Sequence, residues 1–338
     1  MIKATALVCH QDQTFTLEDV HLPEPEADQI AVRCHYSGVS VGTEFAVIRG
    51  KLDWGPFPLV TGYMASGTVE KVGKDIDNFT VGQQIYYRGN DAMAFADGSS
   101  LHPATGAHCS HAVCRPNVEN GAGPLPGGVP LDLASMFTMP AVGHHAVDRA
   151  NPRTTDTVVI VGCGLIGLGL VASCAYRGCN VIAVDVNPHR LDAAKKMGAD
   201  HVIDSAKRDM GEAVHELAPE GADVVFESTG IPALIDPSIA LCRERGLFVW
   251  QGNYGDAKVS FHALSAHGKH LRTLFPCNDG LHPTRRSVLK NMASGTLPWG
   301  RIMTHTIESP DAPGMYDKIN RDAIPETLGA TIHWSDPA

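Results

Sequence analysis

The sequence of 338 residues predicts an α/β protein, in which a mostly-β domain is interrupted by a doubly wound parallel sheet. Residues 157–177 read as a buried strand, a glycine-rich turn and an apolar helix. An alternation of strands and helices continues to about residue 275, and short β-like runs lie on both sides of it. We therefore expect a mostly-β domain at 1–147 and 296–338, and a nucleotide-type domain at 148–295.

The individual elements follow from periodicity and turn residues. In the first segment, strands are predicted at the N-terminus and at 30–34, 65–72, 84–87 and 111–114. In the second, strands are predicted at 157–161, 180–184, 201–203, 223–226, 246–250 and near 271–275, with helices at 165–177, 188–197, 207–217 and 232–243. In the tail, strands at 302–307 and 327–334 flank a helix at 313–321.

The turn after the first strand of the second segment has the spacing G-x-G-x-x-G, with Gly162, Gly164 and Gly167. The first glycine permits a sharp turn, the second permits close approach of a pyrophosphate, and the third permits helix–sheet packing. The helix that follows starts with Leu165 and Ile166, whose backbone N–H groups point toward an anion at the helix N-terminus. The turn therefore predicts a dinucleotide site.

Asp185 ends the next predicted strand, where a carboxylate can accept hydrogen bonds from both adenosine ribose hydroxyls. A 2′-phosphate would face its negative charge, so the predicted cofactor is NAD rather than NADP. Arg190 is a counter-signal because it could reach a 2′-phosphate, although such a residue more often covers the adenine or is solvated.

Composition narrows the class of protein. A net charge of −10 argues against nucleic-acid binding, and no apolar run approaches the ~20 residues of a membrane helix. Nine scattered cysteines without a C-x-x-C pair, and a first segment without signal-peptide features, predict reduced thiols and a cytoplasmic protein.

Several segments in order resemble the medium-chain dehydrogenase/reductase superfamily across nearly the whole chain. The matching segments are Val32–Glu44, Phe57–Gly73, Val81–Ile85, the glycine motif, Met292–Leu297 and Ile302–Ile307. The resemblance implies a GroES-like catalytic domain interrupted by a Rossmann domain, an active site in the cleft between them, and a homodimer or homotetramer.

Zinc-dependent members of this superfamily hold a catalytic ion with Cys, His and a further Cys or Glu. Here Ser40 stands at the first ligand position, Tyr63 and Met64 stand at the second, and residues 137–142 offer no Cys or Glu. These side chains are poor Zn²⁺ ligands. The chain therefore reads as a zinc-free member, and its S-G-V-S-V-G-T-E segment resembles bacteriochlorophyllide 3-hydroxyethyl dehydrogenases.

That resemblance aligns Thr43 and Glu44 with a proton-carrying hydroxyl and a supporting acid. Tyr63 is expected either to donate to the substrate oxygen or to fill the vacated metal cavity. Glu44 is expected to orient Thr43 or Tyr63, or to bind substrate hydroxyls; the alternative is an ion pair with Arg49 or Lys51. Gly230 and Asn253, after the fourth and fifth strands of the second segment, are expected near the nicotinamide.

A cluster of His and Cys residues could suggest a metal site, but we expect histidines at the surface or lining the cleft. The cluster comprises His102, His108, Cys109, His111 and Cys114. In a strand His108 and His111 point to opposite faces. A second pair, His144 and His145, is placed at the start of a helix, where a packed or solvated role is favoured.

The leading function is a zinc-independent NAD-dependent dehydrogenase of a secondary alcohol, with a sugar or polyol as possible substrate. Two alternatives stay open: a quinone or carbon–carbon double-bond reductase using NAD(P)H, and a non-catalytic NAD-binding protein. The expected partner of the protein is a small-molecule substrate, and neither a nucleic acid nor a membrane is predicted as a partner.

Overall fold

The computed structural model describes residues 1–255, 258–276 and 278–335, which form two compact units. Unit 1 comprises residues 1–137, 281–294 and 303–338, and unit 2 comprises residues 138–280 and 295–302. The boundary expected at 147/148 falls inside helix α3 (Thr138–Ala150), because that helix packs along α4. Helix α9 (Leu281–Ala293), expected in the nucleotide domain, belongs to unit 1.

Unit 1 is mostly β-structure, as predicted. Its strands are β1 (Ile2–Cys9), β2 (Phe15–Leu22), β3 (Ile30–Gly38), β4 (Ala65–Val72), β5 (Gln84–Tyr87), β6 (Ala94–Phe95), β7 (His111–Cys114), β8 (Gly123–Pro124), β15 (Met303–Glu308) and β16 (Gly329–His333). One sheet has the order β15-β16-β3-β4-β5-β8, with β7 paired to β3, and the other has the order β1-β2-β6. The chain's tail thus extends the sheet built around β3.

Three shorter helices complete this unit. They are α1 (Thr43–Ile48), α2 (Leu131–Ala134) and α10 (Ala312–Asn320), the last preceded by the 3₁₀ turn η3 (Ser309–Asp311). Helix α10 contributes Tyr316 and Ile319 to the hydrophobic core that fills the inside of the larger sheet. Residues from both ends of the chain therefore share one core.

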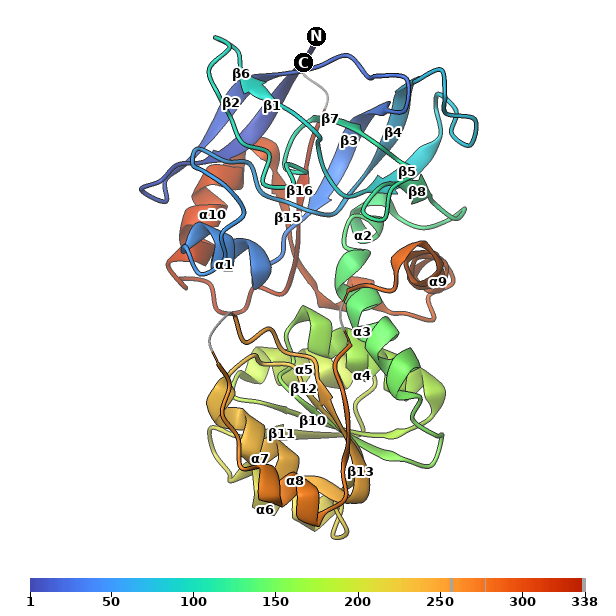
Figure 1. Ribbon diagram of the computed structural model, residues 1–338, viewed down its shortest axis with the longest axis vertical. Helices are drawn as coiled ribbons and strands as arrows, with labels where there is room; N and C mark the ends of the chain where they lie inside the picture. The colour runs from blue at the N-terminus through green and yellow to red at the C-terminus, as the bar shows by residue number, and fades with distance from the viewer. Residues whose placement is uncertain (256–257, 277, 336–338) are drawn as a thin grey trace. The chain divides into compact units, whose positions relative to one another are not determined.

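Unit 2 is a parallel sheet with helices on both faces (Figure 1). Its strands are β9 (Thr157–Val161), β10 (Asn180–Asp185), β11 (His201–Asp204), β12 (Ala222–Glu227), β13 (Cys242–Trp250) and β14 (Arg272–Leu274). Its other helices are α4 (Leu165–Arg177), α5 (Pro188–Lys196), α6 (Met210–Leu217), α7 (Ile235–Ala240) and α8 (Ala263–Gly268), with 3₁₀ turns η1 (Pro232–Leu234) and η2 (Trp299–Ile302). The order β11-β10-β9-β12-β13-β14 reverses between β9 and β12, which is the switch point of a doubly wound fold.

The predicted α/β class is confirmed, and β9 and α4 have the predicted bounds. The helix expected at 232–243 is shorter, because Cys242 already pairs with Ala222 in the sheet. The helix expected from 207 begins at Met210, because the side chain of Asp209 accepts a 2.9 Å hydrogen bond from Glu212 N and caps it. The helices at 263–268 and 281–293 were not predicted.

Candidate functional site

The glycine-rich turn of unit 2 has the geometry that the spacing predicts. Gly162 has φ of +95°, which favours glycine, and its N–H donates to Val184 O at 2.8 Å. A Cβ atom on Gly167 would lie 2.0 Å from Gly162 O, so the fold itself requires glycine there. A Cβ on Gly164 would meet nothing within 4 Å. Gly164 therefore leaves open space in front of the helix rather than satisfying internal packing.

Helix α4 offers an N-terminus suited to phosphate. Gly164 is its N-cap, no side chain caps it, and its first turn, with Leu165 and Ile166, contains no acidic residue. The free backbone N–H groups of a first helical turn and the positive end of the helix dipole attract anions. Together with the open space at Gly164, these features fit a dinucleotide pyrophosphate.

Asp185 lies at the end of β10, beside the glycine turn. Its carboxylate accepts hydrogen bonds from Cys163 N at 2.7 Å and from Asn187 N at 2.9 Å. The guanidinium of Arg190 lies 3.8 Å from the same carboxylate, and the Asp185 side chain is 4% exposed. Arg190 is thus paired with the acid rather than simply solvated.

The ends of β12 and β13 are joined by Glu227, whose side chain is fully buried. Its carboxylate accepts from Thr229 N at 2.9 Å and from the hydroxyls of Thr229 and Tyr254. Burial, followed by the bond to Glu227, raises the pKa of the Tyr254 phenol. The role of Glu227 was not predicted from the sequence, although an acid at the end of a buried strand is an unusual feature that could have indicated one.

Glu227 holds the two loops that carry Gly230 and Asn253. Gly230 has φ of +70°, and a Cβ there would lie 2.4 Å from Asn253 O, so the loops touch. The side-chain oxygen of Asn253 accepts from Gly255 N at 2.9 Å within its own turn. Asn253 is exposed, and its side-chain NH₂ is the group that remains for a ligand.

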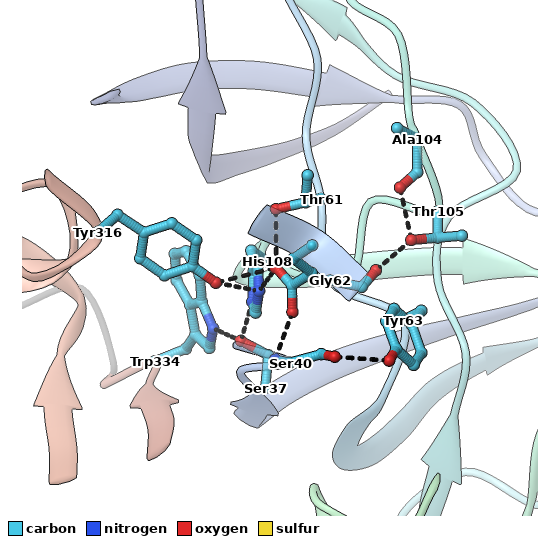
Figure 2. A network of polar contacts seen from close by, with 11 residues as sticks. Ser37, Ser40, Thr61, Gly62, Tyr63, Ala104, Thr105, His108, Tyr316 and Trp334 are labelled. Atoms are coloured by element: carbon cyan, nitrogen blue, oxygen red, sulfur yellow. Dashed lines mark hydrogen bonds and ion pairs between the residues drawn. The ribbon is translucent and has the colours of Figure 1, made fainter. Parts of the chain in front are cut away.

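Unit 1 contains a buried polar network centred on Glu44, in the first turn of α1 (Figure 2). One carboxylate oxygen accepts from Ser40 N at 2.7 Å. The other lies 2.9 Å from Thr61 Oγ1, 2.8 Å from His108 Nε2 and 3.0 Å from Tyr316 OH. Burial alone would raise the Glu44 pKa, but these partners, His108 foremost, lower it below its ordinary value.

These contacts correct the expectations for Glu44. The side chain has no exposed surface, so it cannot bind a substrate hydroxyl directly. The ion pair with Arg49 is also wrong, because that guanidinium bonds to Asn320 and pairs with Asp322 at 3.0 Å. Glu44 therefore acts within the protein interior.

His108 corrects a second expectation, because it is fully buried rather than at the surface or lining a cleft. Its Nδ1 lies 2.8 Å from Ser37 Oγ, which also accepts from the indole N–H of Trp334 at 2.8 Å. The Nε2 of His108 lies 2.8 Å from the Glu44 carboxylate and 2.6 Å from the Tyr316 hydroxyl, so both ring nitrogens have a partner inside the protein.

Tyr63, Ser40 and Thr43 form a cluster of three hydroxyl groups. The Tyr63 phenol donates to Ser40 Oγ at 2.7 Å, and the Thr43 hydroxyl lies near enough to affect the Tyr63 pKa. Burial raises the Tyr63 pKa, while the bonds to Ser40 and Thr43 and the charge of Arg88 act in the opposite direction. The Arg88 guanidinium lies 5.2 Å from the centre of the Tyr63 ring. Tyr63 is 5% exposed and Thr43 is half-buried.

This cluster does not fit a zinc ion. Ser40 and Tyr63 stand at two ligand positions and bond directly to each other, and Met64 is fully buried. A hydroxyl, a phenol and a thioether are poor ligands beside thiolate, imidazole and carboxylate. In residues 1–255, 258–276 and 278–335, no group of three or more His, Cys, Asp or Glu side chains could hold a metal ion.

Three other histidines discussed in the sequence have partners near them. His102 Nε2 lies 2.8 Å from Trp54 O, and His111 Nε2 lies 3.8 Å from Glu70. His144 lies within α3 rather than at its start, because that helix begins at Thr138, and its Nδ1 lies 3.2 Å from Ser173 Oγ. None of the helices in the described part of the chain is long and apolar enough to cross a membrane.

Comparison with known proteins assigns a family match to each of the two units. Residues 26–128 match the alcohol dehydrogenase GroES-like domain, and residues 166–294 match the zinc-binding dehydrogenase family. The chain is 30% identical to (R,R)-butanediol dehydrogenase of Neisseria gonorrhoeae over 66% of this chain and 67% of that protein. It is 26% identical to erythritol/L-threitol dehydrogenase of Mycolicibacterium smegmatis over 90% of each.

Solved structures share the fold. An alcohol dehydrogenase zinc-binding domain protein from Burkholderia ambifaria has a TM-score of 0.87 at 22% identity, covering 99% of this chain and 100% of that one. A zinc-binding dehydrogenase from Sinorhizobium meliloti, bound to NADP, has a TM-score of 0.85 at 21% identity, covering 98% and 100%. The chain belongs to the zinc-type alcohol dehydrogenase-like family of the medium-chain dehydrogenase/reductase superfamily, and it is an oxidoreductase that uses NAD(P).

Proposed function

We propose that this enzyme transfers a hydride between NAD and a secondary alcohol or ketone without zinc, with a polyol or sugar as the substrate class. The proposal is supported by the hydroxyl cluster of Ser40, Thr43 and Tyr63, two of which, Ser40 and Tyr63, align by resemblance with ligand positions of zinc-dependent members. Two of the relatives named above act on a butanediol and on four-carbon polyols.

The roles of the cluster follow from exposure. Thr43 is half-buried, so its hydroxyl is the group that we assign to exchange the substrate proton. Tyr63 is 5% exposed and donates to Ser40, so it either stabilises the substrate oxygen through Thr43 or fills the former metal position. Glu44 fixes the backbone of Ser40 and is a positioning residue rather than a proton acceptor. NAD, when bound, accepts or supplies the hydride.

Thr43→Val and Tyr63→Phe test these roles. Loss of one donor to a developing oxyanion costs roughly 10²–10³ in rate, so kcat should fall strongly while NAD affinity, measured by calorimetry, is unchanged. Tyr176→Phe is the matched control, because that tyrosine is 66% exposed in unit 2. A Tyr63→Phe enzyme with normal kcat and lower stability would assign Tyr63 to filling space. Normal turnover in both variants would refute the proposal. If the enzyme reduces quinones or enones but not ketones, the function is instead that of a quinone or carbon–carbon double-bond reductase.

The choice of NAD over NADP rests on Asp185, which we propose repels a 2′-phosphate. The kcat/KM ratio for the two cofactors should favour NAD, and Asp185→Ser should narrow that preference. Asp204→Ser, at the end of the neighbouring strand β11, should leave the ratio unchanged. Equal or better efficiency with NADP in the unaltered enzyme would refute the assignment.

Independence from zinc is tested by elemental analysis and chelation. The purified protein should carry no stoichiometric zinc, and a chelator should leave both activity and melting temperature unchanged. About one zinc ion per chain, with activity lost on its removal, would overturn our interpretation of Ser40, Tyr63 and Met64.

The proposed homodimer or homotetramer has a candidate surface on unit 2. Strand β14 ends the described sheet, and exposed apolar side chains lie before α8, within α8 and directly after β14. These are Phe261, Leu264 and Phe275, which are 42%, 67% and 67% exposed. Light scattering should give an oligomer, and Phe275→Glu should shift it toward the monomer. A monomeric unaltered protein would refute this. The cytoplasmic location remains part of the proposal.

A further inference from the structure

The C-terminal end of α4 brings two cysteines together. Gly178 has φ of +83°, and its N–H donates to Ala175 O at 2.9 Å. The N–H of the next residue, Cys179, donates to Cys174 O at 3.1 Å. These two bonds define a Schellman motif, in which the residue after the glycine packs its side chain against the residue five positions earlier. In most proteins that contact is apolar; here both partners are thiols.

The two thiols are close enough for each to shift the pKa of the other. Cys179 Sγ also donates to Arg153 O at 3.3 Å. Cys174 is fully buried, whereas Cys179 retains 5% exposure. The pair lies at the opposite end of α4 from Gly162–Gly167, so it has no part in the dinucleotide site described above.

We propose that Cys174 and Cys179 are a redox modification site that closes into a reversible intramolecular disulfide. The two backbone hydrogen bonds of the Schellman motif hold the two residues adjacent at the end of α4. The hydrogen bond from Cys174, the main cause, lowers the pKa of the Cys179 thiol. Cys179 is therefore the attacking sulfur, because the thiolate is the reactive form.

Hydrogen peroxide is a sufficient oxidant. The Cys179 thiolate attacks one peroxide oxygen, the O–O bond breaks, and hydroxide leaves to give a sulfenic acid. The Cys174 sulfur then attacks the Cys179 sulfur; the S–S bond forms and the sulfenic oxygen leaves as water, taking the Cys174 proton. Two thiols are oxidised and one peroxide is reduced to two waters. A dithiol reverses the reaction by exchange.

The bridge would join the end of α4 to the start of β10. It would restrain the unfolded chain without touching the glycine turn, so it should raise the melting temperature and leave NAD affinity unchanged. Because the closed loop is short, the gain should be smaller than for bridges across long loops.

The full-length protein is treated with hydrogen peroxide while native, alkylated, and digested with trypsin. Arg177 lies between the two cysteines, so cleavage separates them into peptides 154–177 and 178–190. We expect these two peptides to appear joined, with a mass two hydrogens below their sum, and to separate after dithiothreitol. Cys242→Ser, which removes another buried thiol of unit 2, should not change this result.

Cys163 lies in the same tryptic peptide as Cys174, so the experiment is repeated with Cys163→Ser. The joined peptides should persist in that variant and vanish in Cys179→Ser. Alkylation of both thiols at every peroxide concentration that leaves the protein folded would overturn the proposal. So would conversion of Cys179 to sulfinic acid without a bridge, or a bridge to Cys163. If the Cys163→Ser variant fails to fold, fragmentation of the joined peptides from the unaltered protein in tandem mass spectrometry shows whether Cys174 or Cys163 carries the bridge.

Discussion

Glu44→Gln tests whether the buried network of unit 1 depends on a carboxylate. Four donors converge on the side chain: Ser40 N, Thr61 Oγ1, His108 Nε2 and Tyr316 OH, at 2.7 to 3.0 Å. A glutamine replaces one carboxylate oxygen with an NH₂ group. This group is a donor, so it faces other donors and has no acceptor for its hydrogens. A buried pair that loses one partner is destabilised by about 3–5 kcal/mol, and we expect a loss of this size in the unfolding free energy when the carboxylate is removed.

The matched control is Glu70→Gln. Glu70 also faces a histidine, His111, but at 3.8 Å, and its side chain is 40% exposed. An exposed pair contributes about 0–1 kcal/mol. Urea unfolding of both variants at pH 7 measures the difference. A loss below about 1 kcal/mol for Glu44→Gln, or one equal to that of the control, would refute the view that the network is an obligatory charged core.

The dependence of the unfolding free energy on pH is a second measurement that tests the Glu44→Gln prediction. The folded-state pKa of Glu44 is lowered from 4.5, so its contribution is fully present above that value and is lost as pH falls through the folded pKa. The unaltered protein should therefore lose stability on acidification in this window. Glu44→Gln should show a shallower loss there, and an identical slope would contradict the lowered pKa.

Two further predictions concern unit 2. Gly164→Ala should keep the melting temperature but weaken NAD binding in calorimetry by about 1.5–3 kcal/mol, the usual worth of a hydrogen bond to a charged group. Gly167→Ala should instead destabilise the fold by about 1–3 kcal/mol, because its Cβ would lie 2.0 Å from Gly162 O; the reverse pattern would contradict both assignments. Glu227→Gln should raise the KM for cofactor and lower the melting temperature, since Thr229 and Tyr254 lose a charged acceptor. An unchanged KM and melting temperature would contradict the role of Glu227 in holding the two loops.

The part of the fold that sequence predicts best is local. Strand β9, the glycine turn and α4 are contiguous, and each residue type there favours its own conformation, so the predicted bounds match. The predicted bounds of the short helix α7 were wrong, because helix propensity does not reveal where the chain enters the sheet. The pairing of Cys242 with Ala222 ends the helix early. Element ends are set by partners that lie elsewhere in the sequence.

The network of Glu44 could not be read from spacing. Its partners His108 and Tyr316 lie 64 and 272 residues away in the chain, on other elements. The same histidine looks like a surface residue in sequence because its neighbours are polar and turn-forming. By contrast, the pair Cys174 and Cys179 carried a usable local signal, since Gly178 lies between them at the end of a predicted helix.

Our proposal that hydroxyl groups take the place of the metal rests on how the Glu44 network and the cluster of Ser40, Thr43 and Tyr63 are satisfied. Zinc requires ligands whose negative charge or lone pairs are free to coordinate. Glu44 has its lone pairs occupied by four donors, and Ser40 accepts from Tyr63, so these groups satisfy one another inside the protein. The half-buried Thr43 hydroxyl, held by the same helix turn as Glu44, is then the group with both a proton and access. This arrangement is the reason that we propose proton transfer by the Thr43 hydroxyl rather than polarisation of the substrate by an ion.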